Sequence, residues 1–164
     1  MFNKTINKFS KNDDYMTQES TWKQIEAFIP KDKVIWEAFF GDGLSAQYLR
    51  SMGCKEVIHH DIDFFEYDFG EIVVSNPPFT LKKEILTRLK ELNRPFILIM
   101  PLLVITSKYF RELFPSGEIQ IIIPSKRIYF EKKVNGVREP PSRPSFDSIY
   151  YCWKMGFEHD INYV

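Results

Sequence analysis

The chain has 164 residues, of which 44% are hydrophobic and 16% aromatic, a composition that excludes a disordered protein and fits one domain with a substantial core. Basic and acidic residues balance at 22 each, and the two cysteines have no metal-ligand spacing, so we expect no bound metal and no disulfide framework. No apolar run approaches the roughly 18 residues of a membrane span, and the first residues form no signal-peptide pattern, so we expect a cytoplasmic protein that is neither secreted nor bound to a membrane.

Helices and strands are predicted to alternate along the chain from residue 19 onward. Apolar periodicity and end signals indicate helices at 19–28, 45–52, 81–92 and 107–114. Short, mostly apolar runs indicate strands at 33–38, 57–60, 72–75, 95–100 and 118–123. Residues 1–16 are predicted to be a flexible tail, because they are rich in polar residues. Residues 17–164 are predicted to be a single domain with no separate target-recognition domain.

The pattern changes after Pro124. Residues 126–130 and 146–154 are predicted to be two antiparallel strands around a basic loop rich in glycine and proline. Almost wholly apolar strands that alternate with helices are typical of a parallel sheet covered on both faces. The sequence therefore predicts an α/β fold with a Rossmann-like, doubly wound, mostly parallel sheet and an antiparallel C-terminal hairpin.

Unusual residues follow three of the predicted strands. In an open α/β sheet, a ligand lies beyond the carboxyl ends of the strands, where the strand order reverses. Residues 37–43, 61–64 and 76–79 all come at such ends. This agreement makes that edge of the sheet the candidate site.

The most informative of these ends is the turn Asn76-Pro77-Pro78-Phe79. The prolines have φ fixed near −65° and no N–H, so the turn is pre-set and the Pro77 carbonyl is a free acceptor. The Asn76 amide oxygen is a second acceptor, and Phe79 offers a face on which a base can stack. The turn favours methyl transfer onto the exocyclic amine of a flat substrate. Asn-Pro also begins ordinary turns, so this interpretation depends on its context.

Two glycines, Gly41 and Gly43, lie in the predicted turn between the first strand and its helix. A turn without side chains lets a ligand approach the backbone closely, although a purely structural tight turn has the same composition. The turn lacks the Gly-Lys-Ser/Thr of a nucleotide-phosphate loop, and its acids repel phosphate.

Acidic residues follow the second strand. Asp61 stands where an acid commonly holds ribose hydroxyls, although a helix cap or a solvated turn also fits it. Asp63 with Phe64 would pair a hydrogen-bond acceptor for an adenine amine with an apolar wall. His59 and His60 are adjacent on a strand and face opposite ways, so the sequence assigns them no role.

Together, residues 37–43, Asp61 and residues 76–79 resemble the S-adenosylmethionine-dependent N6-adenine methyltransferases. Residues 17–22 are similar to the segment that precedes the glycine turn in members whose cofactor-contacting helix comes first. Residues 126–130 with 144–148 are similar to the closing hairpin of small adenine methyltransferases of phages and other mobile or viral genomes. The resemblance covers residues 17–153 and implies a protein that works inside a host cell.

The resemblance implies S-adenosyl-L-methionine as cofactor and a set of site residues. Asn76, Pro77, Pro78 and Phe79 would form the catalytic tip. The cofactor-binding residues would be Thr17, Glu37, Phe39, Gly41, Gly43, Asp61, Asp63 and Phe64. The span before Asn76 is short for the family, so Asp68 is an alternative to Asp63 at the cofactor adenine.

Charge is divided unevenly along the chain. Residues 34–75 hold eight acids and two bases, whereas residues 76–154 hold fourteen bases and seven acids, giving −6 and +7. An acidic half suits a cationic cofactor and a basic half suits a polyanion. The predicted nucleic-acid contacts are Lys126, Arg127, Lys132, Lys133, Arg138 and Arg143, with Phe146 or Tyr129 as a second wall for a flipped base. A solvated basic loop is the alternative.

The predicted mechanism needs no general base. If Asn76 Oδ1 and the Pro77 carbonyl each accept one N–H, the amine lone pair is aimed at the activated methyl group, and positioning supplies the rate gain. DNA is the favoured substrate, with RNA next. Methylation of a glutamine side chain in a protein ranks third, followed by a subunit that binds nucleic acid or a partner without catalysis. Sequence specificity is expected to be loose, or to come from a second copy of the chain or another partner.

Overall fold

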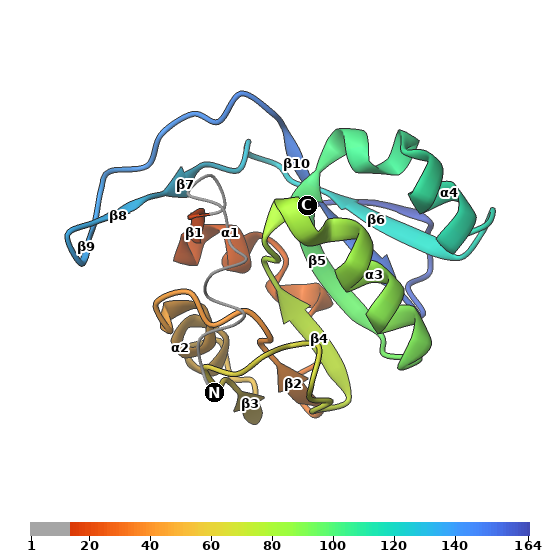
Figure 1. Cartoon of the computed structure of the whole chain (residues 1–164), viewed down its shortest axis with the longest axis horizontal. Helices are drawn as coiled ribbons and strands as arrows, with labels where there is room; N and C mark the ends of the chain where they lie inside the picture. The colour runs from red at the N-terminus through yellow and green to blue at the C-terminus, as the bar shows by residue number, and fades with distance from the viewer. Residues whose placement is uncertain (1–13) are drawn as a thin grey trace.

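The computed structural model describes residues 14–164, and its centre is a seven-stranded sheet with the order β11-β6-β10-β5-β4-β2-β3 (Figure 1). Six strands run parallel, and β10 runs antiparallel between β5 and β6. The bounds are β2 Val34–Trp36, β3 Glu56–Ile58, β4 Ile72–Ser75, β5 Phe96–Pro101, β6 Ile119–Ile123, β10 Ser148–Trp153 and β11 Ile161–Tyr163. This is the fold class expected from the sequence, a Rossmann-like, doubly wound, mostly parallel sheet.

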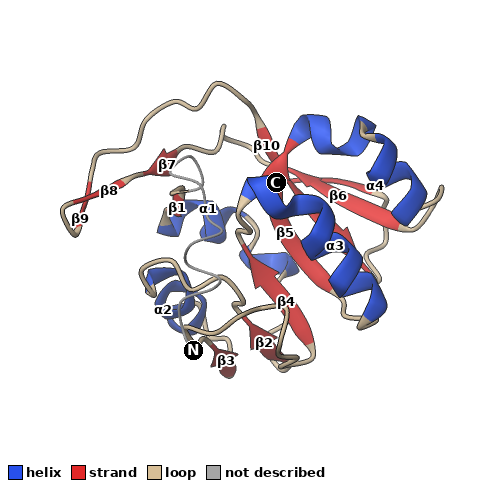
Figure 2. Ribbon diagram, viewed as in Figure 1, coloured by secondary structure: helices blue, strands red, loops and turns tan. Residues whose placement is uncertain are grey.

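Helices cover both faces of the sheet (Figure 2). Helices α1 (Glu19–Gln24) and α2 (Leu44–Ser51) pack on one face, where Trp22 and Leu49 meet one side of the strands. Helices α3 (Lys82–Glu91) and α4 (Lys108–Leu113) pack on the other, where Ile85 and Phe110 are buried. Three short 3₁₀ turns, η2 (Glu26–Phe28), η3 (Phe79–Leu81) and η4 (Leu102–Thr106), complete the described helices. The two separate apolar clusters explain why the central strands are apolar on both sides.

The predicted pairing of residues 126–130 with residues 146–154 is wrong. Strand β10 is buried along its whole length and needs a partner on each side, which β5 and β6 supply. Strand β7 (Phe130–Glu131) pairs instead with β1 (Met16–Thr17) at the start of the described chain. Met16, the last residue of the predicted tail, is therefore in a strand; residues 1–13 of that tail lie outside the described residues.

The basic loop contains a hairpin of its own. Strands β8 (Lys133–Val134) and β9 (Val137–Arg138) pair antiparallel across Asn135 and Gly136, which both have positive φ. Asn-Gly is the preferred pair for such a two-residue turn. Figure 1 shows the hairpin projecting from the body, with a long loop returning to β10.

No helix occurs in the connection from β3 to β4. Phe64 stacks on the buried Trp36 at 5.3 Å between ring centroids, and Phe69 meets the same indole edge-on at 5.7 Å. The chain then passes close to β2 at Gly70, whose φ is 67° and where a Cβ would lie 2.9 Å from the Val34 carbonyl oxygen. Aromatic rings thus fill space on this side of the sheet, and only glycine fits the return to β4.

Candidate active site

The strand order reverses between β2 and β4, as the site prediction requires. The chain leaves β2 to form β3 on one side and returns to form β4 on the other. The carboxyl ends of β2 and β4 are therefore adjacent, and a buried hydrogen bond joins them, from Ser75 Oγ to Glu37 Oε1. The glycine turn and the Asn-Pro-Pro-Phe tip follow directly from these two ends.

A histidine that the sequence left without a role completes this junction. His59 Nδ1 lies 2.9 Å from Glu37 Oε2, with only 4% of the His59 side chain and 1% of the Glu37 side chain exposed. His59 Nε2 lies 3.1 Å from the Phe40 carbonyl oxygen in the glycine turn. The strand predicted at 57–60 ends earlier, at Ile58, so both histidines follow β3; the His59 side chain is buried and His60 is exposed. His59 thus ties the end of β3 to both the acid and the turn that follow β2.

The glycine turn is open in its backbone but covered by the start of the chain. Gly41 and Gly43 have φ of 56° and 85°, and α2 begins directly after Gly43. A Cβ on Gly41 would meet Met16 Sδ at 3.4 Å, so Met16 lies over the turn. Thr17, the next residue, is buried, and Phe39 packs against Phe64 at 5.0 Å. Thr17 and Phe39, two of the predicted cofactor-binding residues, therefore lie beside the turn.

An arginine from the basic loop is bound to the same turn. Arg138 Nε and Nη2 donate to the two carboxylate oxygens of Asp42 at 2.6 and 2.8 Å. Its Nη1 donates to Glu131 Oε2 and to the Thr17 carbonyl, both at 3.0 Å. Only 14% of the Arg138 side chain and 7% of the Asp42 side chain are exposed. The predicted phosphate contact of Arg138 is corrected accordingly, because its guanidinium already binds this chain.

Opposing effects act on the Asp42 carboxyl. Burial would raise its pKa, but the hydrogen bonds from Arg138 and from the Leu44 N–H outweigh burial and lower the pKa of Asp42 below its ordinary value. The hydrogen bond with Asp42 in turn raises the pKa of Arg138. The pair is therefore ionised across the neutral range, and we refer to Arg138, Asp42, Glu131 and Thr17 as the arginine clasp.

Of the residues predicted to contact the ribose and adenine of the cofactor, only some have side chains that are free to bind a ligand. Asp61 is exposed and makes no side-chain hydrogen bond within the described residues. Asp63 Oδ1 accepts from the Phe65 N–H at 2.9 Å and so forms a local turn, while Phe64 is 2% exposed and belongs to the core. Phe64 is therefore a support for the site rather than an open wall.

Asp68, the alternative to Asp63, is excluded from the site. Its carboxylate binds Arg94 at 2.7 and 2.8 Å. Asp68 precedes β4 and Arg94 precedes β5, so the pair lies at the amino end of the sheet, opposite the glycine turn.

The Asn-Pro-Pro-Phe tip is covered. Asn76 Nδ2 donates to the Tyr15 carbonyl at 2.9 Å. Asn76 Oδ1 is buried and has no hydrogen-bond partner among the described residues. Pro77 and Pro78 are buried, and Phe79 is 8% exposed. The Asn76 oxygen has no partner among the described residues but is buried, and Pro77, whose carbonyl was expected to be a free acceptor, is buried too, so the open tip expected from the sequence is covered.

Aromatic rings surround the tip. Tyr15 stacks on Phe79 with 5.5 Å between centroids and 27° between planes. Phe146 meets Phe79 edge-on at 5.4 Å, and Phe130 does so at 6.0 Å. Phe146 therefore reaches the predicted base-binding position from a segment 67 residues further along the chain. We call Phe79, Phe130 and Phe146 the aromatic seat, with Tyr15 as its present occupant.

The predicted phosphate contacts fall into two groups. Lys126, Lys132, Lys133 and Arg143 are exposed. Arg127 instead binds its own chain, with Nε 3.1 Å from Asp147 Oδ1 and Nη2 donating to the Pro144 and Phe146 carbonyls. Arg127 therefore holds the segment that carries Phe146, and its predicted role in binding phosphate is corrected.

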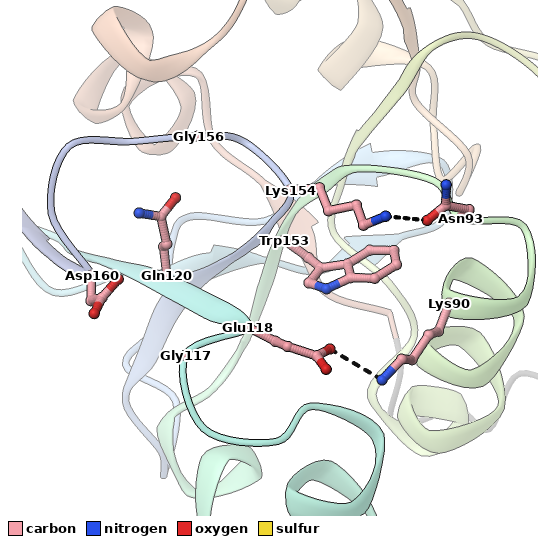
Figure 3. Close-up of a pocket in the computed structure, with 9 residues that line it drawn as sticks. All are labelled: Lys90, Asn93, Gly117, Glu118, Gln120, Trp153, Lys154, Gly156 and Asp160. Carbon is pink, nitrogen blue, oxygen red and sulfur yellow. Dashed lines mark hydrogen bonds and ion pairs between the residues drawn. The ribbon is translucent and has the colours of Figure 1, made fainter.

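Two cavities lie away from these residues. One, of about 580 Å³, is lined by Lys90, Asn93, Glu118, Trp153 and Lys154 (Figure 3). Asn93 and Glu118 precede parallel strands and Lys154 follows the antiparallel one, so this cavity is at the amino end of the sheet. A second, of about 450 Å³, lies beside α4 and β11. Neither contains a predicted site residue.

Two further surveys cover residues 14–164 only. No cluster of three or more histidine, cysteine or acidic side chains in that range is arranged to hold a metal ion. None of the helices in that range combines the length and hydropathy of a membrane span.

No protein-family model and no curated protein matches the sequence. Among solved structures, the fold is similar to a precorrin-6y C5,15-methyltransferase from Geobacter metallireducens GS-15, with TM-score 0.48, 12% identity, and coverage of 90% of this chain and 95% of that one. It is also similar to a precorrin 8W decarboxylase from Methanobacterium thermoautotrophicum, with TM-score 0.45, 14% identity, and coverage of 85% and 97%. A putative methyltransferase from Thermoplasma acidophilum has TM-score 0.38, 12% identity, and coverage of 83% and 73%. With these TM-scores below 0.5, we base the function on the strand order and side chains of this chain.

Proposed function

We propose that the protein is an S-adenosyl-L-methionine-dependent methyltransferase that transfers a methyl group to the N6 amine of adenine in nucleic acid, with DNA as the favoured polymer. The supporting observation is the unpartnered, buried Asn76 Oδ1 at the tip of β4, directly beside the glycine turn that follows β2. A buried acceptor without a partner costs stability, so its retention at this position is best explained by a donor supplied from outside the chain.

The residues around the glycine turn fit the proposed cofactor. Gly41 and Gly43 have no side chains of their own, so a ligand that displaced Met16 from Gly41 could approach the backbone of the turn closely. Glu37 and Asp61 supply negative charge beside this turn, which suits a sulfonium and an ammonium group and opposes phosphate. S-adenosyl-L-methionine, when bound, supplies a methyl group made electrophilic by its sulfonium. Asp61, exposed after β3, is the side chain available to hold ribose hydroxyls.

The tip supports catalysis by orientation. Asn76 Oδ1 and the Pro77 carbonyl would each accept one N–H of the adenine amine, which draws the nitrogen toward a tetrahedral shape. Its lone pair would form the bond to the methyl carbon as the bond from that carbon to the sulfonium breaks, leaving a neutral thioether, and the methylated amine would release one proton to water. Phe79 would hold the base plane at the correct height, with Phe146 at its edge. Fixed acceptors of this kind are worth about 3–4 kcal/mol each when their partner develops charge in the transition state.

Exposed cations support a polyanionic substrate. Lys132 Nζ lies 5.8 Å from the Tyr15 ring in the aromatic seat, Lys133 follows it in β8, and both side chains are exposed. Replacing both by alanine should reduce the slope of log affinity against log salt by about 1.4 for single-stranded DNA, since each phosphate contact contributes about 0.7. Replacing the exposed Lys55 and Lys108 removes the same charge elsewhere and should leave the slope unchanged. Equal salt-dependence slopes for the two double variants would show that Lys132 and Lys133 do not contact the nucleic acid.

The direct test is methyl transfer to competing polymers. The protein is incubated with radiolabelled S-adenosyl-L-methionine and equal amounts of duplex DNA, single-stranded DNA, RNA and a total protein extract. Label in adenine N6 of DNA is the expected result, whereas label in RNA or in glutamine side chains would identify a different substrate class. Cofactor binding without label in any polymer would indicate a non-catalytic binding subunit.

A further inference from the structure

We infer that Tyr15 occupies the seat of the target base, so that the chain's own first strand competes with nucleic acid for Phe79. This inference rests on the proposed function and adds a regulatory contact to the same site. The competitor is a residue of the chain, and the ligand that displaces it is an adenine base in a flexible strand.

The ring geometry of Tyr15 is that of a stacked base. Its ring lies 5.5 Å from Phe79 and is inclined by only 27°, whereas Phe146 and Phe130 meet the Tyr15 ring at 87° and 59°. One parallel wall and two rings at its edges make a slot for a single flat group. A purine is flat and has π-faces, so it suits the same slot.

Tyr15 is also bonded to Asn76, whose amide oxygen a base would use. Its carbonyl accepts the Asn76 Nδ2–H at 2.9 Å, which leaves Asn76 Oδ1 buried and without a partner in the described chain. An adenine amine in the seat would donate to this oxygen. When adenine replaces the Tyr15 ring, Asn76 Oδ1 gains a hydrogen-bond donor that it otherwise lacks, and this favours adenine binding over Tyr15 binding.

Release of Tyr15 does not require the fold to open. The strand β1 has only two residues, Met16 and Thr17, and it pairs with the short strand β7 outside the central sheet. Tyr15 precedes this ladder, so its side chain can leave the seat while Thr17 stays attached to Arg138. Lys132 Nζ lies 5.8 Å from the Tyr15 ring, so an exposed cation that can bind backbone phosphate stands beside the residue to be displaced.

The test measures binding rather than turnover. The probes are a single-stranded oligothymidylate with one central adenine and the same strand with an abasic residue at that position. Ring contacts each correspond to roughly two- to tenfold in an equilibrium constant, so Tyr15→Ala should bind the adenine strand about tenfold more tightly than the wild type. The abasic strand should change by less than about twofold, because it has no base to seat.

Two variants serve as controls. Tyr15→Phe keeps the ring and should bind like the wild type. Tyr163→Ala removes an exposed tyrosine of β11, away from the seat, and should also bind like the wild type. Weaker binding of the adenine strand by Tyr15→Ala, or an equal gain for both strands, would overturn the inference.

A measurement on the wild type covers the case in which Tyr15→Ala does not fold. Hydrogen exchange at residues 14–16 should become faster when the adenine strand is added, because Tyr15 leaves the seat while Thr17 stays attached to Arg138, and unchanged or slower exchange would overturn the inference. The two proposals fail separately. Adenine-dependent displacement of Tyr15 without methyl transfer would reject the proposed function alone, whereas methyl transfer with no Tyr15 effect on binding would reject this inference alone.

Discussion

Replacement of Arg138 by alanine tests whether the basic loop is held by the glycine turn or stands free for nucleic acid. The guanidinium makes four contacts of 2.6–3.0 Å, to both oxygens of Asp42, to Glu131 and to the Thr17 carbonyl. Removal of Arg138 leaves the Asp42 carboxylate, 7% exposed, without its counter-charge. Breaking a fully buried pair costs about 3–5 kcal/mol, and the partly exposed rim of this one reduces the expected loss to about 2–4 kcal/mol.

The assay is thermal unfolding across pH. For a chain of this size, the expected loss lowers Tm by roughly 5–15 °C near neutral pH. The pKa of Asp42 is lower in the folded state, so the folded protein binds this proton less readily than the unfolded chain. The stabilisation is therefore fully present above the ordinary aspartate pKa near 4, and it is lost as the pH falls through the lowered folded value. The Tm difference between wild type and Arg138→Ala should accordingly shrink below about pH 4.

Arg143→Ala is the matched control, because it removes the same charge from an exposed position in the same loop. Its stability should stay within about 0.5 kcal/mol of the wild type. Equal Tm values for Arg138→Ala and Arg143→Ala, or a Tm difference that stays constant from pH 7 to pH 3, would refute the clasp.

Two further substitutions test the frame around the site, each beside a neighbour that serves as its control. His59→Ala removes the partner of the buried Glu37 and the contact to the Phe40 carbonyl. It should lower the free energy of unfolding, measured with denaturant, by about 2–4 kcal/mol and should weaken cofactor binding. His60→Ala, at an exposed position, should change neither. Gly70→Ala places a Cβ 2.9 Å from a backbone oxygen at φ 67° and should lower the free energy of unfolding by more than about 2 kcal/mol. Gly156→Ala, with φ 69° and open space around it, should lower it by only about 1 kcal/mol. Equal losses would show that the close approach to β2 is unimportant.

Local patterns in the sequence predicted the part of the fold that positions the site. Strand β4 was predicted with its observed bounds, because an apolar run that ends in Asn-Pro-Pro leaves no ambiguity about where pairing stops. The neighbouring ends of β2 and β4 followed from the general rule for open sheets. Strand β11 was missed, since three residues with two exposed side chains carry too little apolar signal.

The errors come from contacts between residues far apart in the sequence. Arg138 and Asp42 are 96 positions apart, so a count of basic residues in a loop cannot separate a paired arginine from a free one. Tyr15 was assigned to a polar tail, and nothing in its neighbours indicates a stack on Phe79, 64 positions away. His59 was missed for a related reason, because its acid partner, Glu37, follows a different strand, β2.

The central claim is that Asn76 presents an acceptor to the amine of adenine. The most direct measurement is the amount of N6-methyladenine in a nucleoside digest of adenine-containing DNA after incubation with S-adenosyl-L-methionine, for the wild type and for Asn76→Ala, with cofactor affinity measured in parallel. The account predicts N6-methyladenine with the wild type, a loss of at least about 100-fold in rate with Asn76→Ala, and cofactor affinity within about twofold. N6-methyladenine at an undiminished rate with Asn76→Ala, or loss of cofactor binding together with activity, would contradict it.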